Sequence, residues 1–114
     1  MKRLFLILAV LFSVVVTASA QSSKAQSHQR EAEYYQKRAE SYRREAEYYL
    51  KKAEGYQREA AYYTKRGDLD RAKLQSSYAE RAMDSYELQM RYAAEADEKA
   101  AMHLRWAAEA LRRN

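Results

Sequence analysis

The stretch from Arg30 to Tyr63 repeats so strictly that it constrains the fold more than any other feature of the chain. The phrase R-E-A-E-Y-Y-x-K-K/R-A-E-x-Y starts at Arg30 and again at Arg44, and a third copy with an altered end starts at Arg58. Within this 14-residue period, alanine and tyrosine alternate at spacings of three and four. This heptad pattern is typical of a coiled-coil helix, whose buried face recurs every seven residues.

The predicted buried face of this first helix consists of one row of alanines and one row of tyrosines. The rows are Ala32, Ala39, Ala46, Ala53 and Ala60, and Tyr35, Tyr42, Tyr49, Tyr56 and Tyr63. On the outer face, glutamates precede basic residues by four, as Glu47 precedes Lys51. This order stabilises a helix by about 0.2–0.5 kcal/mol per pair, so we interpret the charged face as solvated.

A break in the pattern near Gly67 predicts a turn. Gly67 suits a left-handed cap after the first helix, and Asp68 or Asp70 suits the start of the second. Because the sequence has no proline and only two glycines, we expect uninterrupted helices over about 26–66 and about 69–111. The predicted fold is all-α, a long antiparallel two-helix hairpin of the coiled-coil type with its turn at 67–68.

Around this turn, residues 56–84 resemble a single tetratricopeptide repeat. The matching positions are Tyr56, Ala60, Tyr63, Gly67, Asp68, Leu69, Ala72 and Ala79. Glu59, Ser76 and Asp84 depart from the motif. One copy of this repeat implies a helical hairpin, whereas a peptide-binding solenoid requires several stacked copies.

The second helix carries a row of mixed residues, beginning with Leu69 and Ser76, and a row of mostly small ones. Its predicted buried positions are Ala72, Ala79, Met83, Tyr86, Met90, Ala93, Asp97, Ala100 and Leu104. Antiparallel pairing sets the alanine rows together and the tyrosines against the mixed row. Two registers satisfy this pattern, with Tyr49 opposite Met83 or opposite Met90. In either register a tyrosine hydroxyl faces Asp97 and can satisfy the carboxylate in a polar layer.

A second, weaker aromatic stripe lies beside the predicted buried face of each helix. On the second helix this stripe includes Ala82 and Ala96. Its large members form a candidate second interface, namely Tyr34, Tyr48, Tyr62, Tyr78, Tyr92 and Trp106. Gly55 lies in the same stripe and suggests a close contact there. Since half of the buried face is mostly alanine, we expect self-association into a helical bundle, most simply two hairpins forming four helices. The alternatives are a monomer with half-exposed tyrosines and an aromatic strip that holds a ligand.

Residues 1–20 have the layout of a secretory signal peptide. They open with two basic residues, continue with an apolar run at 4–16 and end with small residues at 18–20. The run is shorter than the roughly 18–20 residues that span a bilayer, which favours cleavage over a retained anchor. We therefore expect residues 21–114 to form a secreted or periplasmic protein that meets a membrane only if the signal stays uncleaved.

Charge and composition narrow the partners that this protein could have. Cleavage of the signal would lower the net charge from +5 to about +3. This mild excess permits weak contact with acidic molecules without requiring it, and export argues against a nucleic-acid partner. Because the sequence has no cysteine, disulfides and thiol ligands are excluded, and stability must come from packing and association.

The sequence predicts neither a catalytic nor a metal-binding arrangement. His28 and His103 each stand alone near a helix face, without the i,i+4 partners of a zinc site. The serines lie within helical segments rather than at the strained turn of a nucleophile, and there is no glycine-rich phosphate loop. We expect no enzyme activity, no cofactor and no metal.

Together these features predict an exported, non-enzymatic coiled-coil structural or interaction protein of the bacterial cell envelope. Its expected partner is another copy of the chain, with a protein client or an envelope component as further partners. The alternative is a periplasmic holdase or adaptor that binds clients through basic, tyrosine-lined helical arms. That alternative is similar in outline to the small basic coiled-coil chaperones of outer-membrane proteins.

The alanine row gives a direct test of the heptad assignment. Replacing Ala46 with glutamate forces a charge into the helix interface, so we expect a large loss of helicity and a much lower melting temperature. Glu47→Gln changes the neighbouring solvated position and should have little effect. Circular dichroism melting of both variants makes the comparison, and equal melting of the two would contradict the assignment.

Overall fold

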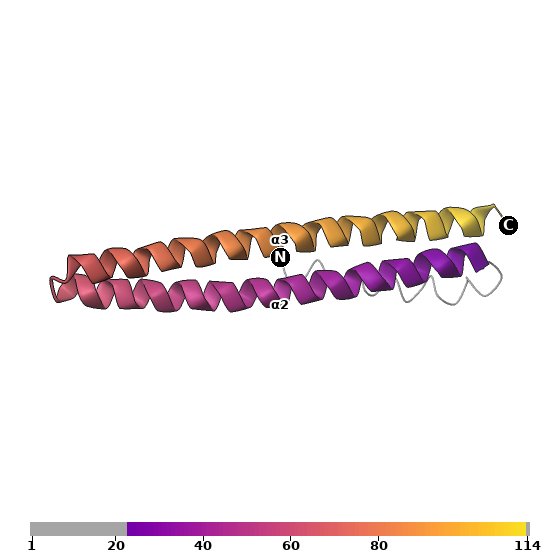
Figure 1. Cartoon of the computed structure of the whole chain (residues 1–114). Helices are drawn as coiled ribbons and strands as arrows, with labels where there is room; N and C mark the ends of the chain where they lie inside the picture. The colour runs from indigo at the N-terminus through magenta and orange to yellow at the C-terminus, as the bar shows by residue number, and fades with distance from the viewer. Residues whose placement is uncertain (1–22, 114) are drawn as a thin grey trace. The chain divides into compact units, whose positions relative to one another are not determined.

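The computed structural model describes residues 23–113, and this part of the protein is all α, with two long helices joined by one turn. Helix α2 comprises Ser23–Lys65 and helix α3 comprises Leu69–Arg112 (Figure 1). Helix α2 thus begins about three residues earlier than predicted, and the other boundaries agree within about one residue. The predicted signal peptide at 1–20 lies outside the described residues.

The chain divides into two compact units. The hairpin unit comprises residues 39–95, and the terminal unit comprises the described residues 23–38 and 96–113. In the hairpin unit, the two helices lie side by side and run antiparallel from the turn (Figure 1). In the terminal unit, the start of α2 packs antiparallel against the end of α3. The predicted antiparallel pairing of two helices is therefore confirmed within each unit.

The turn is closed by the hydrogen bonds of a Schellman motif. Gly67 has a φ of 78°, its N–H donates to the Thr64 carbonyl at 3.1 Å, and the Asp68 N–H donates to the Tyr63 carbonyl at 3.0 Å. Asp68 also caps α3, because its Oδ1 accepts from the Arg71 N–H at 3.2 Å. Of the two aspartates that suited the start of the second helix, the structure selects Asp68.

All buried apolar residues in the described part of the chain are alanines. They are Ala25, Ala32, Ala39, Ala46, Ala53, Ala72, Ala79, Ala82, Ala93, Ala96, Ala100 and Ala107, none more than 7% exposed. No large side chain in residues 23–113 is fully buried. The other predicted interface positions are half-buried, namely Tyr35, Tyr42, Tyr49, Tyr56, Ala60, Tyr63, Met83, Tyr86, Met90, Asp97 and Leu104. The alanines therefore form the centre of the helix interface, and the larger residues line its margins.

The buried face of α3 is rotated relative to the prediction. Ala82 and Ala96, assigned from the sequence to the second stripe, are buried, whereas Leu69 is 65% exposed and Ser76 is also exposed. Two helices approach more closely where both present small side chains. The face of α3 that carries two alanine rows therefore packs against α2, and the mixed row moves to the margin.

Substitution by alanine should have opposite effects on stability at the two glycines. Gly67→Ala introduces a side chain at positive φ, so we expect a loss of about 1–2 kcal/mol in the free energy of unfolding. Gly55 lies inside α2, and a methyl group there would have the Arg58 guanidinium as its nearest neighbour at 4.0 Å. Gly55→Ala should therefore stabilise the helix by about 0.5–1 kcal/mol.

Chemical denaturation of the two glycine variants beside the parent measures both effects. The close contact that Gly55 suggests from the sequence is not present within one copy of the described chain. A destabilised Gly55→Ala variant would contradict the expectation and would indicate that another chain packs against this position.

Candidate functional site

Pairs of aromatic rings join the two helices of the hairpin unit at a regular interval. Tyr42 lies against Tyr92, and Tyr56 lies against Tyr78, each with ring centroids 5.4 Å apart and interplanar angles of 52° and 53°. The two pairs are 14 residues apart on both helices, so they define one antiparallel register. That register is close to the predicted one with Tyr49 opposite Met83, and it excludes the one with Met90.

The terminal unit has the same pattern with different residues. His28 lies against Trp106 with ring centroids 5.4 Å apart and an interplanar angle of 58°. Lys99 Nζ lies 5.5 Å from the centroid of the Tyr35 ring. Trp106, and also Tyr78 and Tyr92 in the hairpin unit, were predicted for a second interface. Each of the three contacts α2 of its own chain, while Tyr92 stays 37% exposed and Trp106 stays 41% exposed.

The three aromatic residues of the second stripe on α2 are about half exposed to solvent. We call them the tyrosine strip: Tyr34, Tyr48 and Tyr62, with exposed fractions of 51%, 52% and 47%. Each ring meets the next tyrosine in the chain edge to face, with centroids 5.2 to 5.3 Å apart. Each ring also has a cation over it four residues later, namely Arg38 at 5.7 Å, Lys52 at 5.2 Å and Arg66 at 4.8 Å. The strip therefore presents aromatic and positively charged groups together.

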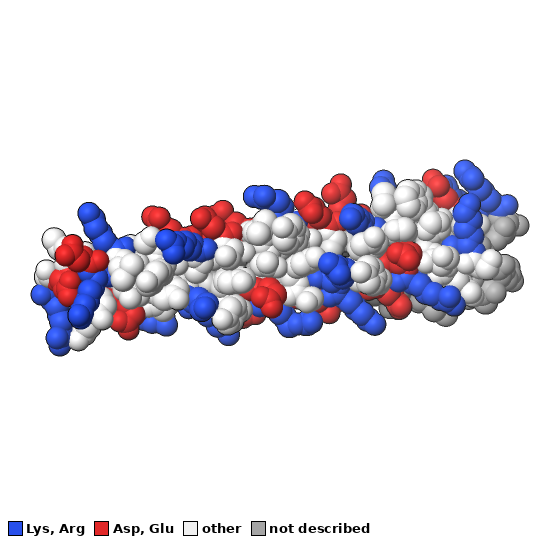
Figure 2. Space-filling view, viewed as in Figure 1, with Lys and Arg blue, Asp and Glu red and all other residues white. Residues whose placement is uncertain are grey.

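One lysine of the tyrosine strip has a shifted pKa. A hydrogen bond with Tyr48 raises the pKa of the Lys52 ammonium above its usual value, and the charges of Tyr48 and Tyr56 add to this. On the face of the protein in Figure 2, basic and acidic side chains are interspersed, with uncharged surface between them. That face offers no continuous basic track of the kind that nucleic-acid binding requires.

The two histidines meet in the terminal unit. His28 Nδ1 lies 3.1 Å from His103 Nδ1, and both rings are half-buried. The Trp106 indole meets the His103 ring edge to face at 5.2 Å, and the Tyr35 ring stacks on the His103 ring at 5.7 Å with an interplanar angle of 12°. The expectation that each histidine stands alone is therefore wrong, because the antiparallel register brings together residues 75 apart in the chain.

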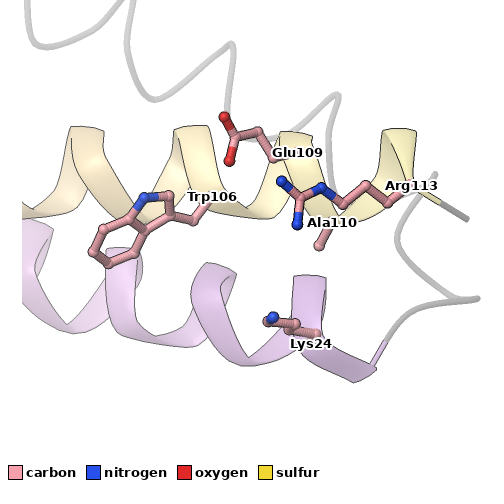
Figure 3. A pocket seen from close by; sticks show the side chains of 5 residues that line it. All are labelled: Lys24, Trp106, Glu109, Ala110 and Arg113. Carbon is pink, nitrogen blue, oxygen red and sulfur yellow. The ribbon is translucent and has the colours of Figure 1, made fainter.

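A cavity of about 240 Å³ lies beside Trp106, at the ends of the two helices. Its described lining residues are Lys24, Trp106, Glu109, Ala110 and Arg113, shown in Figure 3. The indole reaches toward α2, the Arg113 guanidinium points back along α3, and Glu109 points away from Lys24 (Figure 3). The lining is largely charged, which does not suit the apolar pocket of a typical small-molecule site.

Within residues 23–113, no three histidine, cysteine or acidic side chains gather where they could hold a metal ion together. Neither described helix has an apolar segment long enough to cross a bilayer. Comparison of the chain with protein-family models, curated proteins and solved structures found no match.

The ring pairs predict a pattern of energetic coupling across the hairpin unit. In a double-mutant cycle with leucine at both positions, Tyr42 and Tyr92 should couple by about 0.5–1.5 kcal/mol. Tyr42 and Tyr78 do not form one of these pairs, so the same cycle on them should give coupling near zero. Urea unfolding provides the free energies. Equal coupling in the two cycles would contradict the register.

Proposed function

We propose that this protein is an exported structural or interaction protein of the cell envelope that acts as a homo-oligomer. One observation supports this proposal. Among the described residues, the buried apolar interior consists of alanine alone, while Tyr34, Tyr48, Tyr62 and Trp106 remain at least 41% exposed. A protein that buries its smallest apolar side chains and exposes its largest ones gains most by binding a second apolar surface.

The energetics favour association over an isolated chain. An alanine methyl group contributes about 0.8 kcal/mol when buried, whereas a large apolar side chain contributes about 1.5–3 kcal/mol. Ordering the backbone of each residue costs about 1–2 kcal/mol in either case. The burial of alanines therefore offsets only a small part of the entropic cost of ordering two long helices. Burial of the exposed tyrosine rings by a second copy would add further stabilising free energy.

The tyrosine strip is the surface that we assign to this association. In the hairpin unit Tyr48 and Tyr62 lie 14 residues apart on α2, and Tyr34 repeats the spacing in the terminal unit, so a second copy can make the same contact with each ring. The rings are rigid, and the edge-to-face contacts with Tyr35, Tyr49 and Tyr63 already orient them. Aromatic anchors of this kind contribute strongly to protein interfaces.

A second candidate function is a holdase or adaptor for client proteins. The observation that favours it is the cation over each ring of the tyrosine strip, since an aromatic and basic surface can bind unfolded or acidic segments. In that case the strip would remain free in the resting protein.

Sedimentation equilibrium separates the two functions. For a structural homo-oligomer we expect a fixed stoichiometry, and serine at Tyr48 or Tyr62 should weaken association by about 1–2 kcal/mol per ring without loss of helicity. Glu47→Gln changes a neighbouring exposed charge and serves as the control. A monomer that suppresses the aggregation of an unfolded client, less effectively at high salt, would replace the first proposal with the second. A monomer without that activity would contradict both.

A further inference from the structure

The aromatic repeat has one chemical exception. Every seventh residue of α2 from Tyr35 to Tyr63 is tyrosine, but the same row carries histidine at position 28. The other histidine of the sequence, His103, and its single tryptophan, Trp106, lie against this position. The two histidines, which are potential metal ligands, and the tryptophan, which is a spectroscopic probe, thus lie together in the terminal unit.

The imidazoles of His28 and His103 approach each other through their Nδ1 atoms. Their Nδ1 atoms are 3.1 Å apart while the ring centroids are 5.3 Å apart, so the nitrogens lie on the facing sides of the rings. As neutral rings they share one proton, with one Nδ1–H donating to the other Nδ1. Both rings come from rigid helices, which hold the nitrogens close without any loop.

We propose that His28 and His103 form a two-histidine binding site for a divalent late transition metal, with Cu²⁺ bound most tightly. Imidazole nitrogen is a preferred ligand of copper, nickel and zinc, and for a given set of nitrogen ligands affinity is highest for Cu²⁺. The pair lacks the oxygen ligands that Mg²⁺ and Ca²⁺ require. The site has two protein ligands, and water completes the coordination.

The separation of the two nitrogens suits this coordination. With metal–nitrogen bonds of about 2 Å, nitrogens 3.1 Å apart subtend roughly 100° at the metal, between the square-planar and tetrahedral angles. The rings turn about their outer side-chain torsion, which is broad for histidine, so that both lone pairs converge on the ion. Each ring then carries its proton on Nε2, so binding needs no net release of protons from the neutral pair.

Charged groups near the site oppose the binding of a further cation. Lys99 lies over the Tyr35 ring, which stacks on His103, and Lys24 and Arg113 line the cavity beside Trp106. These cations oppose a further positive charge, while Glu109 in the same cavity partly compensates for them. The Trp106 indole contacts both imidazoles and adds no charge of its own to the site.

Trp106 also makes the site measurable, because it is the single tryptophan of the sequence and contacts both ligands. We expect Cu²⁺ to quench the tryptophan fluorescence of the purified protein saturably, with one ion bound per chain in equilibrium dialysis. Ni²⁺ and Zn²⁺ should bind more weakly than Cu²⁺. Nuclear magnetic resonance should show the imidazole signals of both His28 and His103 broadened by the first equivalent of Cu²⁺.

Asparagine at either histidine separates metal binding from a structural role. His28→Asn and His103→Asn keep a hydrogen-bonding group near the position of Nδ1, so helicity should be retained while Cu²⁺ affinity falls by at least about tenfold. Tyr35→Phe keeps the ring stacked on His103 and should leave Cu²⁺ affinity unchanged.

The proposal would be overturned by an absence of saturable quenching, by Cu²⁺ affinity that is the same in the parent and in both asparagine variants, or by broadening that spares the two imidazoles. The last measurement uses the parent protein alone, so it remains decisive if a variant fails to fold. None of these results depends on the oligomeric state, and the outcome is therefore separate from that of the association experiment.

Discussion

The burial of alanines on both α2 and α3 is the feature on which the others depend. A methyl group reaches only a short distance, so the two helices must lie close together before these side chains touch. At that distance the interface centre has no room for a tyrosine or methionine side chain. The larger residues therefore occupy the margins, half-buried, which is where the described chain places Tyr42, Tyr56, Met83 and Met90.

The turn determines the register that the alanines leave open. A row of identical methyl groups can slide by one heptad and still fit, because each step replaces one alanine with another. The tyrosines leave the same ambiguity, because they also recur every seven residues on α2, and a slip by one heptad would set Tyr49 against Tyr92 and Tyr63 against Tyr78. The short turn closed by Gly67 and Asp68 fixes which residues of the two helices lie opposite each other and so selects the observed register. The same arrangement leaves Tyr34, Tyr48 and Tyr62 beyond the interface, available to another chain.

The histidine pair shows how a periodic scaffold can carry chemistry. A repeat of tyrosines offers hydroxyl groups and aromatic faces but no good ligand for a transition metal. At position 28 a histidine occupies the place of a tyrosine in the repeat, and its Nδ1 lies next to the Nδ1 of His103. The helical backbone is the same there as in the rest of the repeat. Because the rings lie on helices rather than on a loop, their separation depends on the same close helix approach that buries the alanines.

Much of the fold follows from the sequence alone. The heptads of alanine and tyrosine predict two helices, and Gly67 followed by Asp68 predicts the turn, because these are local preferences of the backbone and of side chains one turn apart. The tertiary structure alone decided the register, the burial of Ala82 and Ala96 in place of the mixed row, and the meeting of His28 with His103. These features depend on how closely and at what rotation two helices pack. That balance is set by contacts between residues as far apart in the chain as His28 and Trp106, which a local pattern does not record.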